Sequence, residues 1–180
     1  MFELELRAKI INKKQLINKL NLLGVKFICT KTQIDTYFGS IELYKKLDYT
    51  FLLRLRDSDK KLLTYKQSTN SNGIYVEHET QVENLTIYQK IFESMGFDHV
   101  ITVNKKRETY KYNDISINID TFKKFGTFVE FELISESQDK TMLFELLNNL
   151  KIEKTQIIEQ GYITLFLEQS NSPYTMWIRH

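Results

Sequence analysis

The sequence of 180 residues contains one cysteine, one proline and six glycines. Because Cys29 is the only cysteine, a disulfide within the chain is excluded, and we expect the reducing cytoplasm as its location. So few prolines and glycines leave no linker rich in these residues. We therefore expect one domain over residues 1–180.

Long apolar runs and a strong charge of one sign are also absent. No run approaches the roughly 20 residues of a membrane-spanning helix, and the N-terminus lacks the basic-then-apolar layout of a secretory signal. The chain has 25 Lys and Arg against 23 Asp and Glu, whereas a dedicated nucleic-acid binder usually has a clear basic excess. We expect neither a membrane nor a nucleic acid as partner.

The first predicted strand, Phe2–Ile10, alternates strictly between apolar and charged residues. This period of two places Glu3, Glu5, Arg7 and Lys9 on one face of the strand. Two carboxylates beside two cations suit a divalent metal ion and the phosphates that it neutralises. A plain solvated face is the alternative that this strand by itself leaves open.

The remaining pattern predicts antiparallel strands interrupted by a few helices, an α+β fold. With one charged and one apolar face, closure of the sheet into a barrel is expected. Strands are predicted at 25–38, 51–56, 62–67, 74–83, 100–112, 114–122 and 127–134. Helices are predicted at 13–23, 86–95, 139–150 and 162–167, and loops at 40–48 and 68–73.

Charged residues share one face in several of these strands, as they do in the first. Their side chains converge either on solvent or on a common interior, and burial would be costly unless they pair with one another, with metals or with a ligand. The bases concerned are Arg54, Arg56, Lys66, Lys105, Arg107 and Lys111. The acids are Asp120, Glu130 and Glu132, with a further pair, Glu77 and Glu79, whose role the sequence leaves open.

The order and spacing of these residues resemble the CYTH superfamily, the triphosphate tunnel metalloenzymes, which include class IV adenylyl cyclases and thiamine triphosphatases. The resemblance runs from Phe2 to about Ile134 and continues weakly through the C-terminal helices. The motifs are Glu3-x-Glu5-x-Arg7, Gln33-x-Asp35-Thr36-Tyr37-Phe38, Arg54-Leu55-Arg56, Lys66, Lys105-x-Arg107, Asp120 and Gly126-x-Phe128-x-Glu130-x-Glu132.

This resemblance implies a closed eight-stranded antiparallel tunnel with flanking helices that grips a triphosphate. Its strands would lie within about 1–135 and its C-terminal helices within 138–169, followed by a tail at 170–180. The implied ligands of one or two Mg²⁺ or Mn²⁺ ions are Glu3, Glu5, Asp120, Glu130 and Glu132. Arg7, Lys9, Arg54, Arg56, Lys66, Lys105 and Arg107 would line the phosphate path, and Glu3, Glu5, Arg7, Lys9 and Lys66 would be catalytic.

One departure from the family pattern bears on the reaction. The first motif usually ends in lysine, whereas this chain has Arg7, which keeps its proton at any ordinary pH. A cyclase uses the 3′-hydroxyl of its substrate as nucleophile, so Arg7 favours conversion of ATP to cyclic AMP and pyrophosphate. The alternatives are hydrolysis of tripolyphosphate or thiamine triphosphate, and a noncatalytic protein that binds a nucleotide or polyphosphate. Nucleobase preference, metal number and a homodimer stay open.

Overall fold

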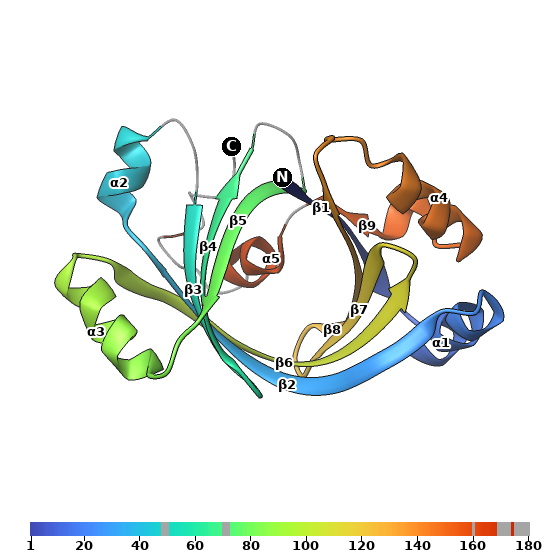
Figure 1. Ribbon diagram of the computed structural model, residues 1–180, viewed down its shortest axis with the longest axis horizontal. Coiled ribbons are helices and arrows are strands. Elements are labelled where there is room, and N and C mark those ends of the chain that lie inside the picture. Colours follow the sequence, from blue (N-terminus) through green and yellow to red (C-terminus); the bar gives the residue numbers. More distant parts are fainter. Residues whose placement is uncertain (48–50, 70–72, 160, 169–173, 175–180) are drawn as a thin grey trace. The chain divides into compact units, whose positions relative to one another are not determined.

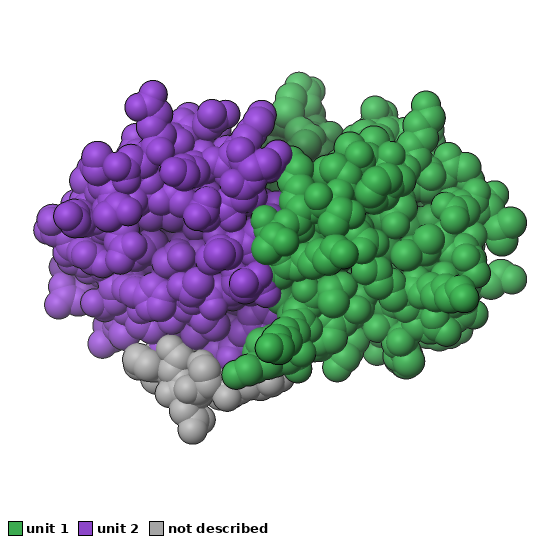
Figure 2. Space-filling view, turned by 90° about the horizontal axis from the view of Figure 1, so that it is seen from below, with its two compact units in different colours: residues 1–32, 105–159 green, residues 33–104, 160–180 purple. Residues whose placement is uncertain are grey.

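The structure is a computed structural model that describes residues 1–47, 51–69, 73–159, 161–168 and 174 (Figure 1). The chain divides into two compact units, coloured separately in Figure 2. Unit 1 comprises residues 1–32 and 105–159, and unit 2 comprises residues 33–104 and 160–180. Strands β2 (Lys26–Gly39) and β6 (Asp98–Tyr112) contribute residues to both units.

Unit 1 is an antiparallel arrangement of strands with two α-helices. β6 pairs with β7, β7 with β8 and β8 with β1, and the two-residue strand β9 pairs with the other side of β1. Besides its parts of β2 and β6, the unit holds β1 (Phe2–Ile10), α1 (Lys13–Leu22), β7 (Ile115–Phe122), β8 (Gly126–Ser135), α4 (Thr141–Asn149), the 3₁₀ helix η1 (Lys154–Gln156) and β9 (Ile157–Ile158).

Unit 2 has the same antiparallel character. β2 pairs with β3, β3 with β4 and β4 with β5, each with its sequence neighbour. Besides its parts of β2 and β6, the unit holds α2 (Ile41–Lys46), β3 (Phe51–Asp57), β4 (Lys61–Ser68), β5 (Ile74–Gln81), α3 (Leu85–Ser94) and α5 (Tyr162–Glu168).

Local sequence explains where α1 and α3 begin and end. The side chain of Asn12 accepts a hydrogen bond from the backbone N–H of Gln15, and Asn84 caps α3 in the same way. Gly24 and Gly96 follow the two helices with φ of +71° and +81°, a left-handed conformation that glycine adopts without strain. The two glycines are the local signals from which the ends of both helices are predicted.

Each unit has its own apolar core. In unit 1, Leu4, Ile117 and Phe131 are fully buried on one side of the strands, and α4 lies against β1 and β8. In unit 2, Phe38 of β2 packs its ring against Phe92 of α3, with a centroid separation of 5.4 Å. The opposite side of the strands in each unit is left for the polar side chains of the motifs.

The predicted strands and four predicted helices are confirmed to within a few residues, and the chain is an antiparallel α+β protein with flanking helices. The loop predicted at 40–48 is wrong, because residues 41–46 form α2, whose Tyr44 stacks on Phe51 at 5.3 Å between ring centroids. η1 and β9 were not predicted, since each is too short for a periodic signal.

Closure into a tunnel and one domain over residues 1–180 stay predictions. The predicted tail at 170–180 lies outside the described residues except for Tyr174. Among the described residues, no helix has the length and apolar character needed to cross a membrane.

Truncation of a core side chain in β8 should test the packing of unit 1. Phe131→Ala should lower the free energy of unfolding by about 3 to 5 kcal/mol, because Phe131 is fully buried and leaves a cavity. Ile134→Ala, in the same strand but 58% exposed, should change it by less than about 0.5 kcal/mol. Urea denaturation measures both, and equal losses would contradict this placement of the core.

Candidate functional site

The register of four strands gathers the predicted residues of unit 1 on one side of its sheet, which we call polar face 1. Side chains directly opposite one another in paired strands share a face, so the pairings define rows across it. The first row is Lys9, Phe128, Asp120 and Arg107; the second is Arg7, Glu130, Asn118 and Thr109; the third is Glu5, Glu132, Ser116 and Lys111. Glu3 begins a fourth row beside Ile134.

Polar face 1 is not a solvated surface. Glu5 is 2% exposed and Asp120 is fully buried, and Arg7, Lys105 and Glu130 are buried as well. Ionised groups withdrawn from water are costly unless opposite charges or a ligand compensate them. The solvated-face alternative for the first strand is therefore wrong for Glu5 and Arg7, whereas Lys9 is exposed.

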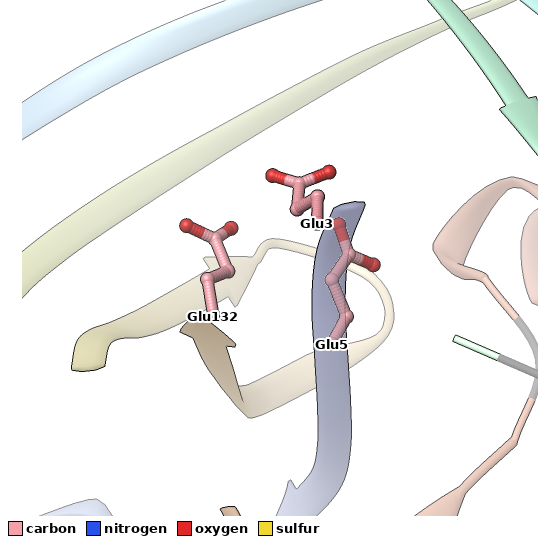
Figure 3. A group of neighbouring side chains, drawn as sticks. All are labelled: Glu3, Glu5 and Glu132. Atoms are coloured by element: carbon pink, nitrogen blue, oxygen red, sulfur yellow. The ribbon is translucent and has the colours of Figure 1, made fainter. Parts of the chain in front are cut away.

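Three carboxylates of this face form a group, which we call the acid triad: Glu3, Glu5 and Glu132 (Figure 3). One oxygen from each lies within 4.8 Å of the others. Glu5 and Glu132 are directly opposite each other in β1 and β8, and Glu3 lies two residues from Glu5 on the same face. Hard carboxylate oxygens are the ligands that Mg²⁺ and Mn²⁺ prefer, so this donor set fits either ion.

The electrostatics of the acid triad also fit a cation. Burial, together with the neighbouring carboxylates of Glu130 and Glu3, raises the pKa of Glu132 to about 8, although Arg107 opposes the shift. At neutral pH this carboxyl therefore keeps its proton unless a positive charge arrives beside it. A divalent ion between the three carboxylates would supply that charge.

The other two predicted metal ligands, Asp120 and Glu130, are held by bases. Arg107 donates to both oxygens of Asp120 at 2.7 and 2.6 Å, and Lys105 donates at 3.2 Å. Burial by itself would raise the pKa of Glu130, but Arg7, Arg107 and Lys105 hold that pKa well below its usual range. Both carboxylates are thus partners of predicted phosphate ligands, and the structure does not bring them into the acid triad.

Arg7 begins the second row of polar face 1. Its guanidinium pairs with Glu5 in its own strand and lies 3.6 Å from Glu130 in β8. Arg7 therefore connects Glu5 of the acid triad to Glu130. Lys9, two residues on, has its backbone carbonyl bound by the Gln156 amide while its side chain is exposed.

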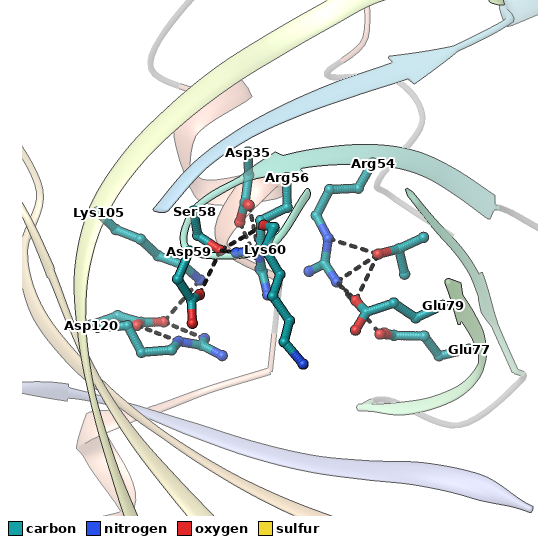
Figure 4. Close-up of polar contacts among 12 residues, drawn as sticks. Asp35, Arg54, Arg56, Ser58, Asp59, Lys60, Glu77, Glu79, Lys105 and Asp120 are labelled. Atoms are coloured by element: carbon teal, nitrogen blue, oxygen red, sulfur yellow. Dashed lines mark hydrogen bonds and ion pairs between the residues drawn. The ribbon is translucent and has the colours of Figure 1, made fainter. Parts of the chain in front are cut away.

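The predicted residues of unit 2 form a second group, which we call polar face 2. It consists of Asp35, Arg54, Arg56, Lys66, Glu77 and Glu79. Arg56 donates to both oxygens of Asp35 at 2.6 and 2.8 Å (Figure 4). Asp35 is 1% and Arg56 7% exposed, so this is a buried, two-pronged ion pair between β2 and β3. The two hydrogen bonds therefore hold the Arg56 guanidinium in one orientation against the Asp35 carboxylate.

Arg54 and Lys66 in polar face 2 also have carboxylate partners. Arg54 donates to Thr64 at 2.9 Å and to Glu79 at 3.0 Å, with Glu77 at 3.5 Å (Figure 4). Lys66 pairs with Glu77 at 3.1 Å and lies over the ring of Tyr75. The acids of β5, whose role the sequence left open, are therefore partners of predicted phosphate ligands.

These partners could not be assigned from the sequence. Alternation places Asp35, Glu77 and Glu79 on charged faces, but it does not say which base lies opposite which acid. Pairing depends on the register between strands, as in Lys66↔Glu77 and Arg56↔Asp35, and register is a tertiary property.

The ion pair in polar face 2 should be needed for stability. Asp35→Leu leaves the Arg56 guanidinium buried without its carboxylate and should lower the free energy of unfolding by about 3 to 5 kcal/mol. The double variant Asp35→Leu/Arg56→Met should recover most of that loss, as measured by urea denaturation. Additive losses would show that the two side chains act separately.

Metal binding at the acid triad should depend on pH. Because the Glu132 carboxyl has a pKa of about 8, a bound ion must displace its proton, and the affinity for Mn²⁺ should rise as pH rises from 6 to 8, by up to about tenfold per pH unit. Titration calorimetry in buffers of different ionisation enthalpy measures affinity and proton release together. Glu132→Gln should remove the pH dependence, whereas Glu136→Gln, an exposed change in the same unit, should retain it. A pH-independent affinity in the native protein would contradict this assignment.

Comparison with known proteins gives relatives over nearly the whole chain. A protein of Methanocaldococcus jannaschii named "Putative adenylate cyclase" is 35% identical over 174 residues, which are 92% of this chain and 98% of that protein. A solved Pyrococcus horikoshii structure has a TM-score of 0.81 at 25% identity, covering 91% of this chain and 98% of the other.

A solved structure from Hippeastrum has the same fold, with a TM-score of 0.60 at 16% identity over 94% of this chain and 95% of that one. It is described as a "putative adenylyl cyclase" with a dominant triphosphatase activity. The CYTH domain family matches residues 1–162, the greater part of the sequence. The chain therefore belongs to the CYTH domain family.

Proposed function

We propose that this protein is a metal-dependent enzyme acting on a triphosphate, and that it converts ATP to cyclic AMP and pyrophosphate. The observation that carries this proposal is the acid triad of Glu3, Glu5 and Glu132, which is partly buried and lies on the same face as Arg7, Lys105 and Arg107. A module that only binds phosphate needs the bases but not a group of neighbouring carboxylates. The name of the M. jannaschii relative supports the same reaction class.

The acid triad would hold Mg²⁺ or Mn²⁺, which when bound polarises phosphoryl oxygens and the attacking hydroxyl. Arg107 and Lys105 are the bases of polar face 1 for the phosphate oxygens; Arg107 offers a planar fork and Lys105 a point charge. Asp120 orients both of them through its three hydrogen bonds. Arg54, Arg56 and Lys66 of polar face 2 stay predicted phosphate ligands, each now with a carboxylate partner.

In the proposed reaction the 3′-oxygen of ATP attacks the α-phosphorus in line, and the bond from the α-phosphorus to the oxygen that bridges it to the β-phosphorus breaks. The hydroxyl proton passes to solvent water, and the electron pair of the broken bond leaves with pyrophosphate, whose negative charge the bases Lys105 and Arg107 offset. No side chain has to generate a hydroxide from water. This agrees with Arg7, which cannot accept a proton and is engaged by Glu5 and Glu130.

Hydrolysis of tripolyphosphate or thiamine triphosphate is the second candidate function. The Hippeastrum protein with this fold has a dominant triphosphatase activity, so the fold by itself does not select the reaction. A hydrolase needs an activated water, and the lysines predicted for that task are the exposed Lys9 and the Glu77-paired Lys66. Lys9 points to solvent and Lys66 is engaged by a carboxylate, so neither is a ready base for water, which is why we favour the cyclase.

Product analysis decides between these reactions. Incubated with Mn²⁺ and ATP, the native protein should release cyclic AMP and pyrophosphate in equal amounts, separated by chromatography. Glu3→Gln should abolish turnover while leaving the fold intact by circular dichroism, because it removes one metal ligand charge and keeps the shape. Glu136→Gln serves as the control with unchanged turnover. Orthophosphate from tripolyphosphate, without cyclic AMP from ATP, would establish the hydrolase instead, and binding without any turnover would establish a noncatalytic protein.

A further inference from the structure

One neutral pair interrupts the charges of polar face 1. Asn118 and Thr109 are directly opposite each other in β7 and β6, and Asn118 is directly opposite Glu130 in β8. The rows on either side contain Asp120 with Arg107, and Ser116 with Glu132. An amide and a hydroxyl therefore lie side by side between rows that contain the predicted metal and phosphate ligands.

The hydrogen bonding of Asn118 leaves its amide nitrogen open. Thr109 Oγ1 donates to Asn118 Oδ1 at 2.9 Å, which fixes the orientation of the amide. Asn118 is 3% exposed, and among the described residues no hydrogen bond involves its Nδ2 group, which carries two donors. The amide oxygen is occupied by Thr109, and an amide group whose donors have no protein partner among the described residues of this face is able to bind a ligand oxygen.

The chemistry of the pair selects the kind of ligand group. Phosphate oxygens are best bound by cations, and polar face 1 already has Arg7, Lys105 and Arg107. Neutral amide donors suit the oxygen of a neutral hydroxyl instead. In the proposed cyclase reaction, the sugar must lie close to the metal ligands, because its 3′-oxygen attacks the metal-bound phosphoryl group. Asn118 fulfils this condition. It lies directly opposite Glu130 in β8, and Ser116, two residues earlier in β7, lies directly opposite Glu132.

We propose that Asn118, oriented by Thr109, is a specificity-determining residue that binds a ribose hydroxyl of a nucleoside triphosphate. This inference rests on the proposed function. The inference adds to the proposed function a residue that favours binding of nucleotides over inorganic triphosphates, because inorganic triphosphates have no ribose hydroxyl for Asn118 to bind. Asn118 acts on binding of the organic part of the substrate, and the phosphates are bound without it.

Equilibrium binding in Mn²⁺ tests the proposal with three probes. These are α,β-methylene-ATP, which the cyclisation cannot cleave, 2′,3′-dideoxy-ATP, which lacks both hydroxyls, and pyrophosphate, which lacks the nucleoside. Asn118→Leu should weaken binding of α,β-methylene-ATP by about five- to tenfold, the effect of one lost neutral hydrogen bond. Binding of the other two probes should change by less than about twofold.

A second pair of variants distinguishes a specific loss of nucleotide binding from a general effect on the fold. Thr109→Val removes the donor that orients the amide and should weaken only α,β-methylene-ATP, by about two- to fivefold. The matched control is Thr121→Val, the same change in β7, where Thr121 alternates with Asp120 and so lies on the other face of the strand. It should leave all three affinities unchanged.

The outcomes separate the inference from the function on which it rests. An equal loss for all three probes in Asn118→Leu, or no loss for any, overturns the role of Asn118 while the proposed function stands. Should the native protein bind none of the three probes, the proposed function fails and the inference fails with it. If Asn118→Leu does not fold, Thr109→Val against Thr121→Val gives the same decision.

Discussion

The burial of charge on both polar faces is the constraint on which the rest of this structure depends. Charged side chains such as Glu5, Arg56 and Asp120 are nearly or fully withdrawn from water. That is tolerable only because each has a partner at short distance, as in the Arg56–Asp35 pair at 2.6 Å and the Arg107–Asp120 pair at 2.6 Å. The strands must keep their register, because a slip of one residue would turn every partner to the opposite face.

The two polar faces differ in how their carboxylates are arranged. In polar face 2, Arg54, Arg56 and Lys66 each have a carboxylate partner within 3.1 Å. In polar face 1, the acids gather instead, and burial beside other carboxylates raises the pKa of Glu132 to about 8. The grouping of three carboxylates beside their ion pairs makes polar face 1 the better candidate for a divalent ion.

The family to which the chain belongs accommodates more than one reaction, so the chemistry has to be argued from side chains. Arg7 stands where a lysine is usual in the family pattern, and it pairs with Glu5 and Glu130. An arginine can orient carboxylates and neutralise phosphate, but it cannot take a proton from water. Asn118 adds a neutral contact among these charges, a feature that a site for inorganic phosphate chains has no need of.

The sequence by itself determined where the strands and most helices lie and which residues share one face of a strand. Strict alternation in Phe2–Ile10 and the helix-ending glycines Gly24 and Gly96 are local signals, and the structure confirms the strand and both helices. Alternation also identified Glu3, Glu5 and Glu132 as acids on charged faces. The ordered motifs identified the family, because they are read along the chain without knowledge of distances.

Tertiary structure alone decided which of those acids meet and which bases they bind. Glu132 joins Glu3 and Glu5 and pairs with Arg107, whereas Glu130, two residues earlier, is held by both Arg7 and Arg107. Helix α2 forms where a loop was expected, since packing of Tyr44 on Phe51 outweighs a weak local preference. The neutral pair of Asn118 and Thr109 appears only once β6 and β7 are in register. Register and packing join residues far apart in the chain, and local sequence patterns contain no information about that pairing.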